Sequence, residues 1–245
     1  MNKIKTRKAL VTGANGDIGY ALLHNLLNQG YLTLAMDKDI NRLLSLQSAY
    51  SILQTKKIDL SEPQQIENIT EIGEEPYDVL IYAAGIREII PAAKLSIAEW
   101  QQVLAVNLTS AWVISKQVAQ LAMKHDHPLC IIFISSISGL AGEAQRSAYC
   151  ASKHGLIGLA KSLAMEWADY NIRINVIAPG IIETALTKPY QSNPQLMDQI
   201  NQNIPLKRWG KPRHIAQTAE LIMNNDYLTG STFVVDGGWM AGKQL

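Results

Sequence analysis

The residues that decide the predicted fold are 129–139, LCIIFISSISG, and 147–153, SAYCASK. The first six form an apolar run that is rich in isoleucine and too short to cross a membrane. Such a run is typical of a central strand in a parallel sheet that is covered on both faces. Two serines end this strand, and Ser136 is the second of them. The pattern turns helical at 147, so Tyr149 and Lys153, four residues apart, are predicted to share one helix face.

These three side chains are predicted to meet at a ligand site, because ligands bind at the carboxyl ends of the strands in open α/β sheets. A free tyrosine has a pKa of about 10 and is a poor base at neutral pH. A lysine charge at roughly 4 Å, with an effective dielectric constant of about 20, favours the phenolate by about 4 kcal/mol. That energy equals about three pKa units. We therefore predict that Lys153 lowers the pKa of Tyr149 to near neutrality and that Tyr149 exchanges a proton with an alcohol or a carbonyl. A tyrosine and a lysine at this spacing are usually an exposed pair, so the rest of the chain must support the prediction.

Composition favours an ordered α/β domain without a charged-polymer partner. The chain has 245 residues, of which 47% are hydrophobic and 18% are charged, and this disfavours disorder. The formal net charge is +1, from 22 basic and 21 acidic residues, so no nucleic-acid or membrane partner is indicated. The basic residues near the start precede only a short apolar stretch, Ala9-Leu10-Val11, which is no export signal. We therefore expect a cytoplasmic protein.

The cysteines and histidines predict neither a disulfide framework nor a metal site. Cys130 and Cys150 form no CxxC motif. Cys150 is next to Tyr149 but points about 100° round the helix, which disfavours a nucleophilic role. His125 and His127 have no cysteine or carboxylate partners at ligand spacing.

Strand-like and helical segments alternate along the chain, which is typical of βαβ units with right-handed crossovers. We predict one α/β domain over residues 1–245, with a doubly wound, Rossmann-like parallel sheet of about seven strands and helices on both faces. The strands are expected at 7–12, 31–36, up to 59, 77–83, 129–134, 172–178 and 232–235. The helices are expected through 22–27, around 40–44, after the capping boxes Ser61/Gln64 and Ser96/Glu99, from 147, and at 215–223.

Residues 181–211 are the least regular part of the chain, with Pro189, Pro194 and Pro205 inside it and Pro212 directly after it. Irregular loops at a ligand edge are often mobile, so residues 184–211 are predicted to be a lid over the substrate. The residues expected to form the substrate pocket are Ile86, Leu140, Glu143, Gln145, Tyr149, Leu186 and Tyr190.

A glycine-rich loop, residues 13–19, GANGDIG, follows the first strand and opens a helix. Glycines there let the backbone approach a pyrophosphate at the helix N-terminus, which is typical of dinucleotide-binding proteins. Asp37 ends the second strand, where a carboxylate binds the ribose hydroxyls and repels a 2′-phosphate. We therefore predict NAD in preference to NADP; Lys38 and Arg42 are the residues that speak for NADP.

The order and spacing of several motifs resemble the short-chain dehydrogenase/reductase family over essentially the whole chain. The matching residues are Thr12-Gly13 with Gly19, Ala84-Gly85, Asn107, Ser136, Tyr149-x-x-x-Lys153 and Asn175-x-x-x-Pro179-Gly180. The resemblance implies an enzyme that interconverts a secondary alcohol and a ketone by hydride transfer to or from NAD(H).

The resemblance also implies a role for each matching residue. Tyr149 would be the general acid/base, Lys153 its partner and a ligand of the nicotinamide ribose, Ser136 a ligand of the substrate oxygen, and Asn107 the holder of a proton-relay water. Asp59 would cap the adenine, and Ile182 and Thr184 would contact the nicotinamide carboxamide. The implied coenzyme-binding residues are together Gly13, Asn15, Asp17, Ile18, Gly19, Asp37, Asp59, Leu60, Ala84, Gly85, Tyr149, Lys153, Pro179, Gly180, Ile182 and Thr184.

Three departures from the family pattern bear on function. Asp17 stands where the family has a third motif glycine, and a carboxylate is unfavourable near a pyrophosphate unless it turns away. Tyr82-Ala83 replaces two asparagines. Two arginines that acyl-carrier-protein reductases offer to their carrier align with His127 and Tyr170, which speaks against such a partner.

Two alternatives to the alcohol/ketone oxidoreductase stay open. The first alternative is another enzyme, a 3-oxoacyl-[acyl-carrier-protein] reductase that uses NADPH. The second alternative is a protein of another class, a non-catalytic dinucleotide-binding sensor. The resemblance further implies a homotetramer, for which the helices after Ser96 and Ser147 and the apolar Trp239-Met240 offer surface. The expected partners are thus a small alcohol or ketone and other copies of the chain.

Overall fold

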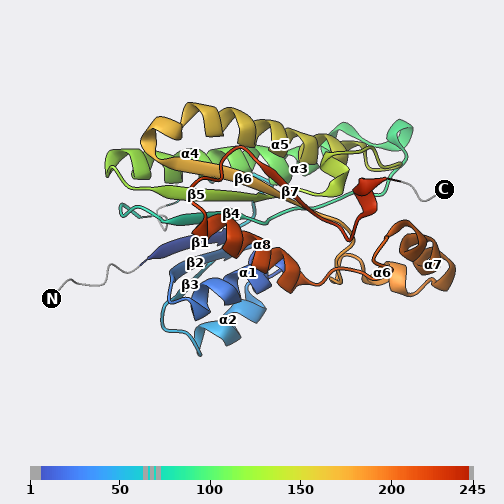
Figure 1. Ribbon diagram of the computed structural model, residues 1–245, viewed down its shortest axis with the longest axis horizontal. Helices are drawn as coiled ribbons and strands as arrows, with labels where there is room; N and C mark the ends of the chain where they lie inside the picture. Colours follow the sequence, from blue (N-terminus) through green and yellow to red (C-terminus); the bar gives the residue numbers. More distant parts are fainter. Residues whose placement is uncertain (1–6, 63–65, 67–68, 70–72, 243–245) are drawn as a thin grey trace.

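The computed structural model of the protein describes residues 7–62, 66, 69 and 73–242, and its strands form one all-parallel sheet between two layers of helices (Figure 1). In the order in which they hydrogen-bond, the strands are β3 (Leu53–Lys57), β2 (Leu32–Asp37), β1 (Lys8–Thr12), β4 (Val79–Tyr82), β5 (Leu129–Ile134), β6 (Ile172–Pro179) and β7 (Thr232–Val235). The predicted fold class, a doubly wound parallel sheet, is confirmed.

The helices cover both faces of this sheet. They are α1 (Asp17–Asn28), α2 (Asn41–Gln47), α3 (Ile97–Leu104), α4 (Ser110–Lys124), α5 (Ser147–Glu166), α6 (Lys188–Gln191), α7 (Pro194–Asn203) and α8 (Pro212–Asn224). Figure 1 shows α1, α2 and α8 on one side of the sheet and α3, α4 and α5 on the other. In the described part of the chain, no helix has both the length and the apolar composition that crossing a membrane requires.

The central strand β5 shows why the sheet needs both layers. Every one of its residues is buried. The odd-numbered residues belong to the apolar cluster that contains α4 and α5, and the even-numbered residues belong to the cluster that contains α1 and α8. Side chains alternate between the two faces of a strand, so a strand that is apolar at every position is stable only between two apolar layers.

The strand order reverses at β1, which pairs with β2 on one side and with β4 on the other. Such a reversal opens a crevice outside the carboxyl ends of the strands. The segment with α6 and α7 follows β6 and lies beyond that end of the sheet (Figure 1).

The long helix predicted after Ser96 is present but interrupted. Its capping box is formed, because the Ser96 hydroxyl accepts from the Glu99 amide at 3.2 Å and the Glu99 carboxylate accepts from the Ser96 amide at 2.9 Å. After α3 the helix widens into a π turn, Ala105–Thr109, before it continues as α4. A π turn is rare and often marks a functional site.

Tyr82, at the end of β4, stabilises this π turn. Its hydroxyl lies 2.5 Å from the Val106 carbonyl and 3.1 Å from the Ser110 hydroxyl. Its ring packs edge-on against Phe133 of β5. The tyrosine that departs from the family pattern therefore joins the sheet to the wide helical turn.

Three segment predictions need correction. Residues 184–211 are not an irregular loop throughout, because they contain α6 and α7, each with a proline in its first turn, where an amide donor is not needed. The last helix starts at Pro212 rather than at 215, because a proline is also accepted in the first turn of this helix. The fourth strand covers 79–82 rather than 77–83. The predicted capping box Ser61/Gln64 falls outside the described residues at its second member.

Candidate active site

A cavity of about 390 Å³ opens at the carboxyl edge of the sheet, where β4, β5 and β6 end. Three of the four predicted catalytic residues line it, namely Ser136, Tyr149 and Lys153. The predicted coenzyme-binding residues that also line it are Ile18, Gly85, Pro179, Gly180, Ile182 and Thr184. Residues from distant parts of the sequence therefore surround one space.

Lys153 is buried at this site, with 4% of its surface exposed. Its ammonium donates a hydrogen bond to the Ile134 carbonyl at 2.9 Å. Burial lowers the pKa of Lys153 to about 8, because a charge is poorly stabilised away from water. A Cβ atom at Gly85 would lie 3.2 Å from the ammonium nitrogen, so a glycine at this position leaves room for the lysine.

Tyr149 presents a neutral phenol. Burial raises its pKa above the usual 10.0, although the hydrogen bond with Ser136 and the charges of Arg87 and Arg146 lower it in part. The prediction that Lys153 brings the pKa of Tyr149 near neutrality is therefore wrong for this structure. The Lys153 ammonium lies 5.7 Å from the centre of the Tyr149 ring, and the spacing of the two residues on a helix says nothing of the burial that dominates the pKa.

Ser136 follows β5 in an extended conformation, with a φ of −167°. Its hydroxyl accepts from the Ser138 amide at 3.1 Å and lies 3.2 Å from the Ser138 hydroxyl. The Ser138 hydroxyl in turn donates to the Glu143 carboxylate at 2.8 Å. Ser136 and Tyr149 line the same cavity, so the serine hydroxyl and the phenol can together hold one substrate oxygen.

Asn107, in the π turn, is fully buried and does not line the cavity. Its amide oxygen accepts from the Ile86 amide at 2.8 Å. Its amide nitrogen donates to the Ile86 carbonyl at 2.8 Å and to the Ser152 hydroxyl at 2.9 Å. The side chain thus fixes the loop after β4 against α5, and its role with a relay water stays a prediction.

The glycine loop packs tightly against the end of β4. Gly13 has a φ of +65°, and a Cβ atom there would lie 2.5 Å from the Ala84 nitrogen. A Cβ atom at Gly19 would overlap the Gly13 carbonyl oxygen. Only glycine fits both positions. The loop therefore runs close to the N-terminus of α1, whose partial positive charge favours a phosphate.

Asp17, at the first position of α1, turns toward other partners. Its carboxylate accepts from the Ala185 amide at 2.7 Å and pairs with the Arg42 guanidinium at 3.2 Å. The Arg42 guanidinium lies 3.5 Å over the centre of the Tyr20 ring. The carboxylate that departs from the family pattern thus connects the glycine loop to the segment after β6.

Asp37 is the last residue of β2, and Asp59 and Leu60 come shortly after β3. The Asp37 carboxylate accepts from the Asn15 amide at 2.9 Å, which joins the end of β2 to the glycine loop. Asp59 accepts from the Ser61 amide at 2.8 Å, and hydrogen bonds from Ser61 hold the pKa of Asp59 below its usual value. Leu60 is buried.

Three charged residues at the site, Arg87, Arg146 and Glu88, were not among the predicted site residues. Arg87 and Arg146 line the cavity. The Glu88 carboxylate accepts from the amides of Ala148 at 2.8 Å and Tyr149 at 3.2 Å, so it caps the helix that carries the phenol. Arg146 directly precedes that helix and could have been found there. No local pattern signals that Glu88 meets a helix some sixty residues on, or that Arg87 reaches the Leu186 carbonyl.

The predicted substrate pocket is correct in part. Ile86, Glu143, Tyr149, Leu186 and Tyr190 line the cavity. Leu140 and Gln145 do not, which corrects the prediction. Leu140 is 39% exposed. Gln145 adopts a φ of +64° and uses its carbonyl to accept from the Ile90 amide.

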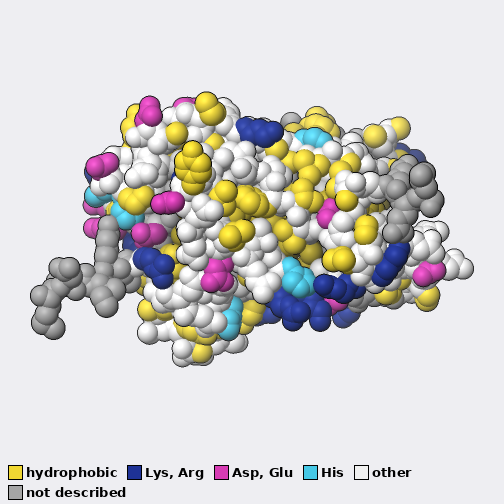
Figure 2. Space-filling view, in the orientation of Figure 1, with side chains coloured by type: hydrophobic (Ala, Val, Ile, Leu, Met, Phe, Trp, Pro, Cys, Tyr) yellow, Lys and Arg dark blue, Asp and Glu magenta, His cyan; other side chains and the backbone are white. Residues whose placement is uncertain are grey.

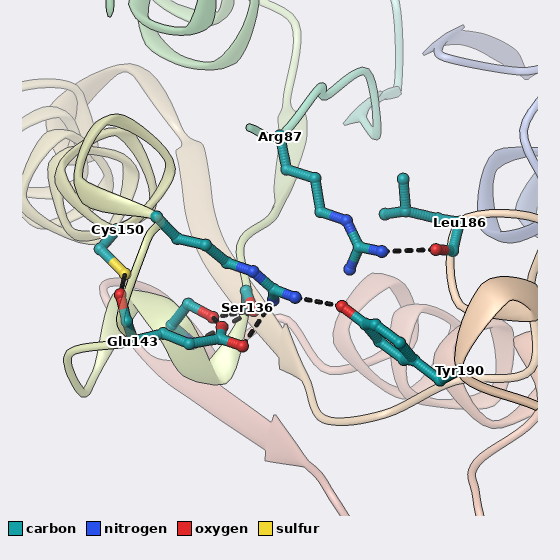
Figure 3. Close-up of polar contacts among 8 residues, drawn as sticks. Arg87, Ser136, Glu143, Cys150, Leu186 and Tyr190 are labelled. Atoms are coloured by element: carbon teal, nitrogen blue, oxygen red, sulfur yellow. Dashed lines mark hydrogen bonds and ion pairs between the residues drawn. The ribbon is translucent and has the colours of Figure 1, made fainter. Parts of the chain in front are cut away.

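Figure 3 shows the polar contacts beside this pocket, with Arg87 pointing toward the Leu186 carbonyl and Ser136 close to Glu143. The Cys150 sulfur lies 4.0 Å from the Glu143 carbonyl, and burial raises the pKa of the Cys150 thiol. Among the residues that the structure describes, no three His, Cys, Asp or Glu side chains gather in a way that would hold a metal ion.

Comparison with known proteins places the chain in a family. Residues 13–240 match the family model described as enoyl-(acyl carrier protein) reductase. The chain is 34% identical to a short-chain type dehydrogenase/reductase, y4vI, of Sinorhizobium fredii (strain NBRC 101917 / NGR234), over 97% of this chain and 44% of that protein. It is also 34% identical to the 2-dehydro-3-deoxy-D-gluconate 5-dehydrogenase of Bacillus subtilis (strain 168), over 97% of this chain and 96% of that protein.

A solved structure of 4-hydroxyisoleucine dehydrogenase complexed with NADH has the same fold, with a TM-score of 0.94 and 40% identity over 97% of this chain and 100% of that one. The motifs, the parallel sheet and these relatives agree. The chain belongs to the short-chain dehydrogenase/reductase family, and it is an NAD(P)-dependent oxidoreductase that acts on CH–OH groups.

Proposed function

We propose that the protein interconverts a secondary alcohol and a ketone at the cavity beside Tyr149, with NAD(H) as the coenzyme and Tyr149 as the general acid/base. The observation that carries the proposal is the convergence of Ser136, Tyr149 and Lys153 on one cavity at the carboxyl edge of the sheet. The glycine loop lies at the same edge, where the strand order reverses.

Each catalytic residue has a distinct task. The bound nicotinamide supplies or accepts the hydride. In reduction, the phenol of Tyr149 gives its proton to the carbonyl oxygen while Ser136 holds that oxygen. In oxidation, Tyr149 must first be in its phenolate form, whose oxygen then takes the proton of the alcohol. Lys153, whose ammonium lies 5.7 Å from the centre of the Tyr149 ring, would bind the nicotinamide ribose. Asn107 supports the site through the π turn and is the proposed holder of a relay water.

The residues present fit a dinucleotide. We assign the pyrophosphate to Gly13, Asn15, Asp17, Ile18 and Gly19, because the loop has no side chain at its closest approach to β4. The adenosine is assigned to Asp37, Asp59 and Leu60, and the nicotinamide half to Ala84, Gly85, Tyr149, Lys153, Pro179, Gly180, Ile182 and Thr184. Asp17 is compatible with the pyrophosphate because its carboxylate is occupied by the Ala185 amide and Arg42.

The alternatives have less support. For an acyl-carrier-protein reductase, the two positions aligned with carrier-binding arginines are His127, which is buried and lies 3.1 Å from Asp78, and Tyr170, which is uncharged. A sensor without turnover would not need Ser136, Tyr149 and Lys153 around one cavity. Consumption of NADH with a ketone separates both enzymes from the sensor.

Residues 184–211 are proposed to act as the substrate lid within a single domain, residues 1–245. Two contacts support this. The Ala185 amide is bonded to Asp17 at the coenzyme side, and the Leu186 carbonyl accepts from Arg87 at 2.5 Å on the substrate side. The segment therefore touches both halves of the site.

The first prediction concerns Tyr149. Tyr149→Phe removes the transferable proton and keeps the ring, so reduction of any ketone that the wild type accepts should fall by at least ~10² while NADH binding is retained. The assay is NADH consumption over a panel of small ketones related to polyols, hydroxy acids and cyclic alcohols. Tyr170→Phe, at a half-exposed residue, is the matched control and should leave the rate unchanged. Activity of Tyr149→Phe within tenfold of wild type would contradict the role of Tyr149.

Preference for NAD over NADP is supported by two side chains. The Asp37 carboxylate is held at the end of β2 by the Asn15 amide, in the place where it would repel a 2′-phosphate. Arg42, one of the two cations that speak for NADP, is already paired with Asp17 and stacked on Tyr20.

The second prediction follows from this arrangement. NADH should bind at least ~10-fold more tightly than NADPH at equal ionic strength, because one carboxylate–phosphate repulsion of about 1.4 kcal/mol has that effect. Asp37→Asn should narrow the difference, and Asp39→Asn, at the exposed neighbouring aspartate, should leave it as it is. Equal or tighter binding of NADPH by the wild type refutes the preference.

We further propose a cytoplasmic homotetramer. The two cysteines are free, as is usual in a reducing compartment. Large apolar side chains are exposed on α3, α4 and α5, with Ile97 at 71%, Trp112 at 43% and Met165 at 84%. Figure 2 shows further hydrophobic side chains gathered across the face that carries β7, where Val234 is 44% exposed.

The third prediction concerns the oligomeric state. Light scattering at micromolar concentration should give four times the chain mass, and a stable monomer would exclude the assembly.

A further inference from the structure

Two arginines enter the cavity from different elements. Arg87 comes from the loop after β4, and Arg146 directly precedes α5. Their guanidinium carbons lie 5.1 Å and 6.0 Å from the centre of the Tyr190 ring, on α6. Figure 3 shows the Arg87 guanidinium near Tyr190 and turned toward the Leu186 carbonyl. The substrate side of the cavity is therefore bounded by two cations.

Only one of these cations is neutralised. The Arg146 guanidinium pairs with the Glu143 carboxylate at 2.6 Å and also bonds the Tyr190 hydroxyl. The Arg87 guanidinium makes one hydrogen bond within the described residues, to the Leu186 carbonyl at 2.5 Å. None of the ion pairs between described residues includes Arg87. The neighbouring Glu88 is buried and does not line the cavity; one of its carboxylate oxygens accepts from the amides of Ala148 and Tyr149, and the other has no hydrogen-bond partner among the described residues.

The position of Arg87 is fixed by the fold. Asn107 holds both backbone groups of Ile86, the residue before it, at 2.8 Å. The Tyr190 ring and the Leu186 carbonyl hold the guanidinium at its far end. A guanidinium has five donors in a rigid planar fork that matches a carboxylate. The Arg87 guanidinium thus has a defined position, N–H donors without a partner, and no ion pair among the described residues. These are the properties of a group that binds an anionic ligand.

We propose that the substrate is a hydroxy or oxo carboxylic acid whose carboxylate binds Arg87 while its hydroxyl or carbonyl oxygen lies at Ser136 and Tyr149. The inference deepens the proposed alcohol/ketone oxidoreductase and rests on it. Because Glu143 already neutralises Arg146, Arg87 is the cation of the cavity that a substrate carboxylate would pair with. Arg87 lies in the loop after β4 and bonds the Leu186 carbonyl of the lid. A carboxylate bound to Arg87 would therefore connect the substrate to both the loop and the lid.

The test uses binding, so that it does not depend on turnover. The probes are succinate and its uncharged isostere succinamide, titrated by calorimetry into the full-length protein saturated with NADH. Succinate should bind the wild type at least ~10-fold more tightly than succinamide, since a charge-assisted bidentate pair is stronger than a neutral one. Arg87→Gln should reduce this ratio to within about twofold, and Arg87→Lys, which keeps the charge without the fork, should give an intermediate ratio.

The matched control is Arg213→Gln, which removes an exposed arginine on α8 outside the cavity and should leave the ratio unchanged. Equal binding of succinate and succinamide by the wild type overturns the proposal. A preference that persists in Arg87→Gln, or that is lost only in Arg146→Gln, overturns the assignment to Arg87. Failure of the oxidoreductase proposal looks different, because then no ketone, charged or neutral, consumes NADH although succinate still binds through Arg87.

Discussion

The buried ammonium of Lys153 is the constraint around which the carboxyl edge of the sheet is built. The Lys153 ammonium donates to the carbonyl of Ile134, the last residue of β5, at 2.9 Å. The backbone carbonyl of Lys153 accepts from the Ser135 hydroxyl, also at 2.9 Å. Gly85 leaves room for the ammonium, and a Cβ atom at Gly139 would lie 2.7 Å from the Lys153 carbonyl oxygen. Two loops and one strand end therefore pack against one residue of α5, through its ammonium and its backbone carbonyl.

This constraint joins the fold to its chemistry. The helix that carries Lys153 also carries Tyr149 one turn earlier, and Glu88 fixes the first turn of that helix. Burial leaves the Tyr149 phenol neutral and so ready to give a proton to a carbonyl oxygen. The same burial lowers the pKa of Lys153. An isolated charge costs stability when it leaves water, so the lysine is kept at the expense of the fold.

Much of the fold and of the candidate site is predictable from local sequence patterns, whereas contacts between distant elements and the effects of burial are not. The apolar run at 129–134, the strand–helix alternation and the glycine loop predicted the sheet, its covered faces and the edge that binds ligands, because periodicity reports which faces are apolar. Periodicity could not reveal that Tyr82 joins the π turn, since that contact spans distant elements. Nor could it place Arg87 in the cavity. The pKa of Tyr149 was mispredicted because a helical spacing gives proximity to a charge but not the loss of water around both groups.

The unfolding free energy of Lys153→Met as a function of pH tests the burial of this lysine most directly. The folded pKa of about 8 lies below the usual 10.5, so the unfolded chain binds more protons between these values and wild-type stability should rise with pH there. The lowered pKa means that the buried charge costs the wild-type fold about 3 kcal/mol below pH 8. Lys153→Met removes this cost but also loses the hydrogen bond to Ile134, which contributes about 1 kcal/mol. Urea unfolding should therefore show Lys153→Met more stable than wild type by about 2 kcal/mol at pH 7, with the gap closing above pH 8, and Lys161→Met, at an exposed site on the same helix, unchanged. A variant less stable than wild type at pH 7, or a gap that does not change with pH, would contradict the buried charge.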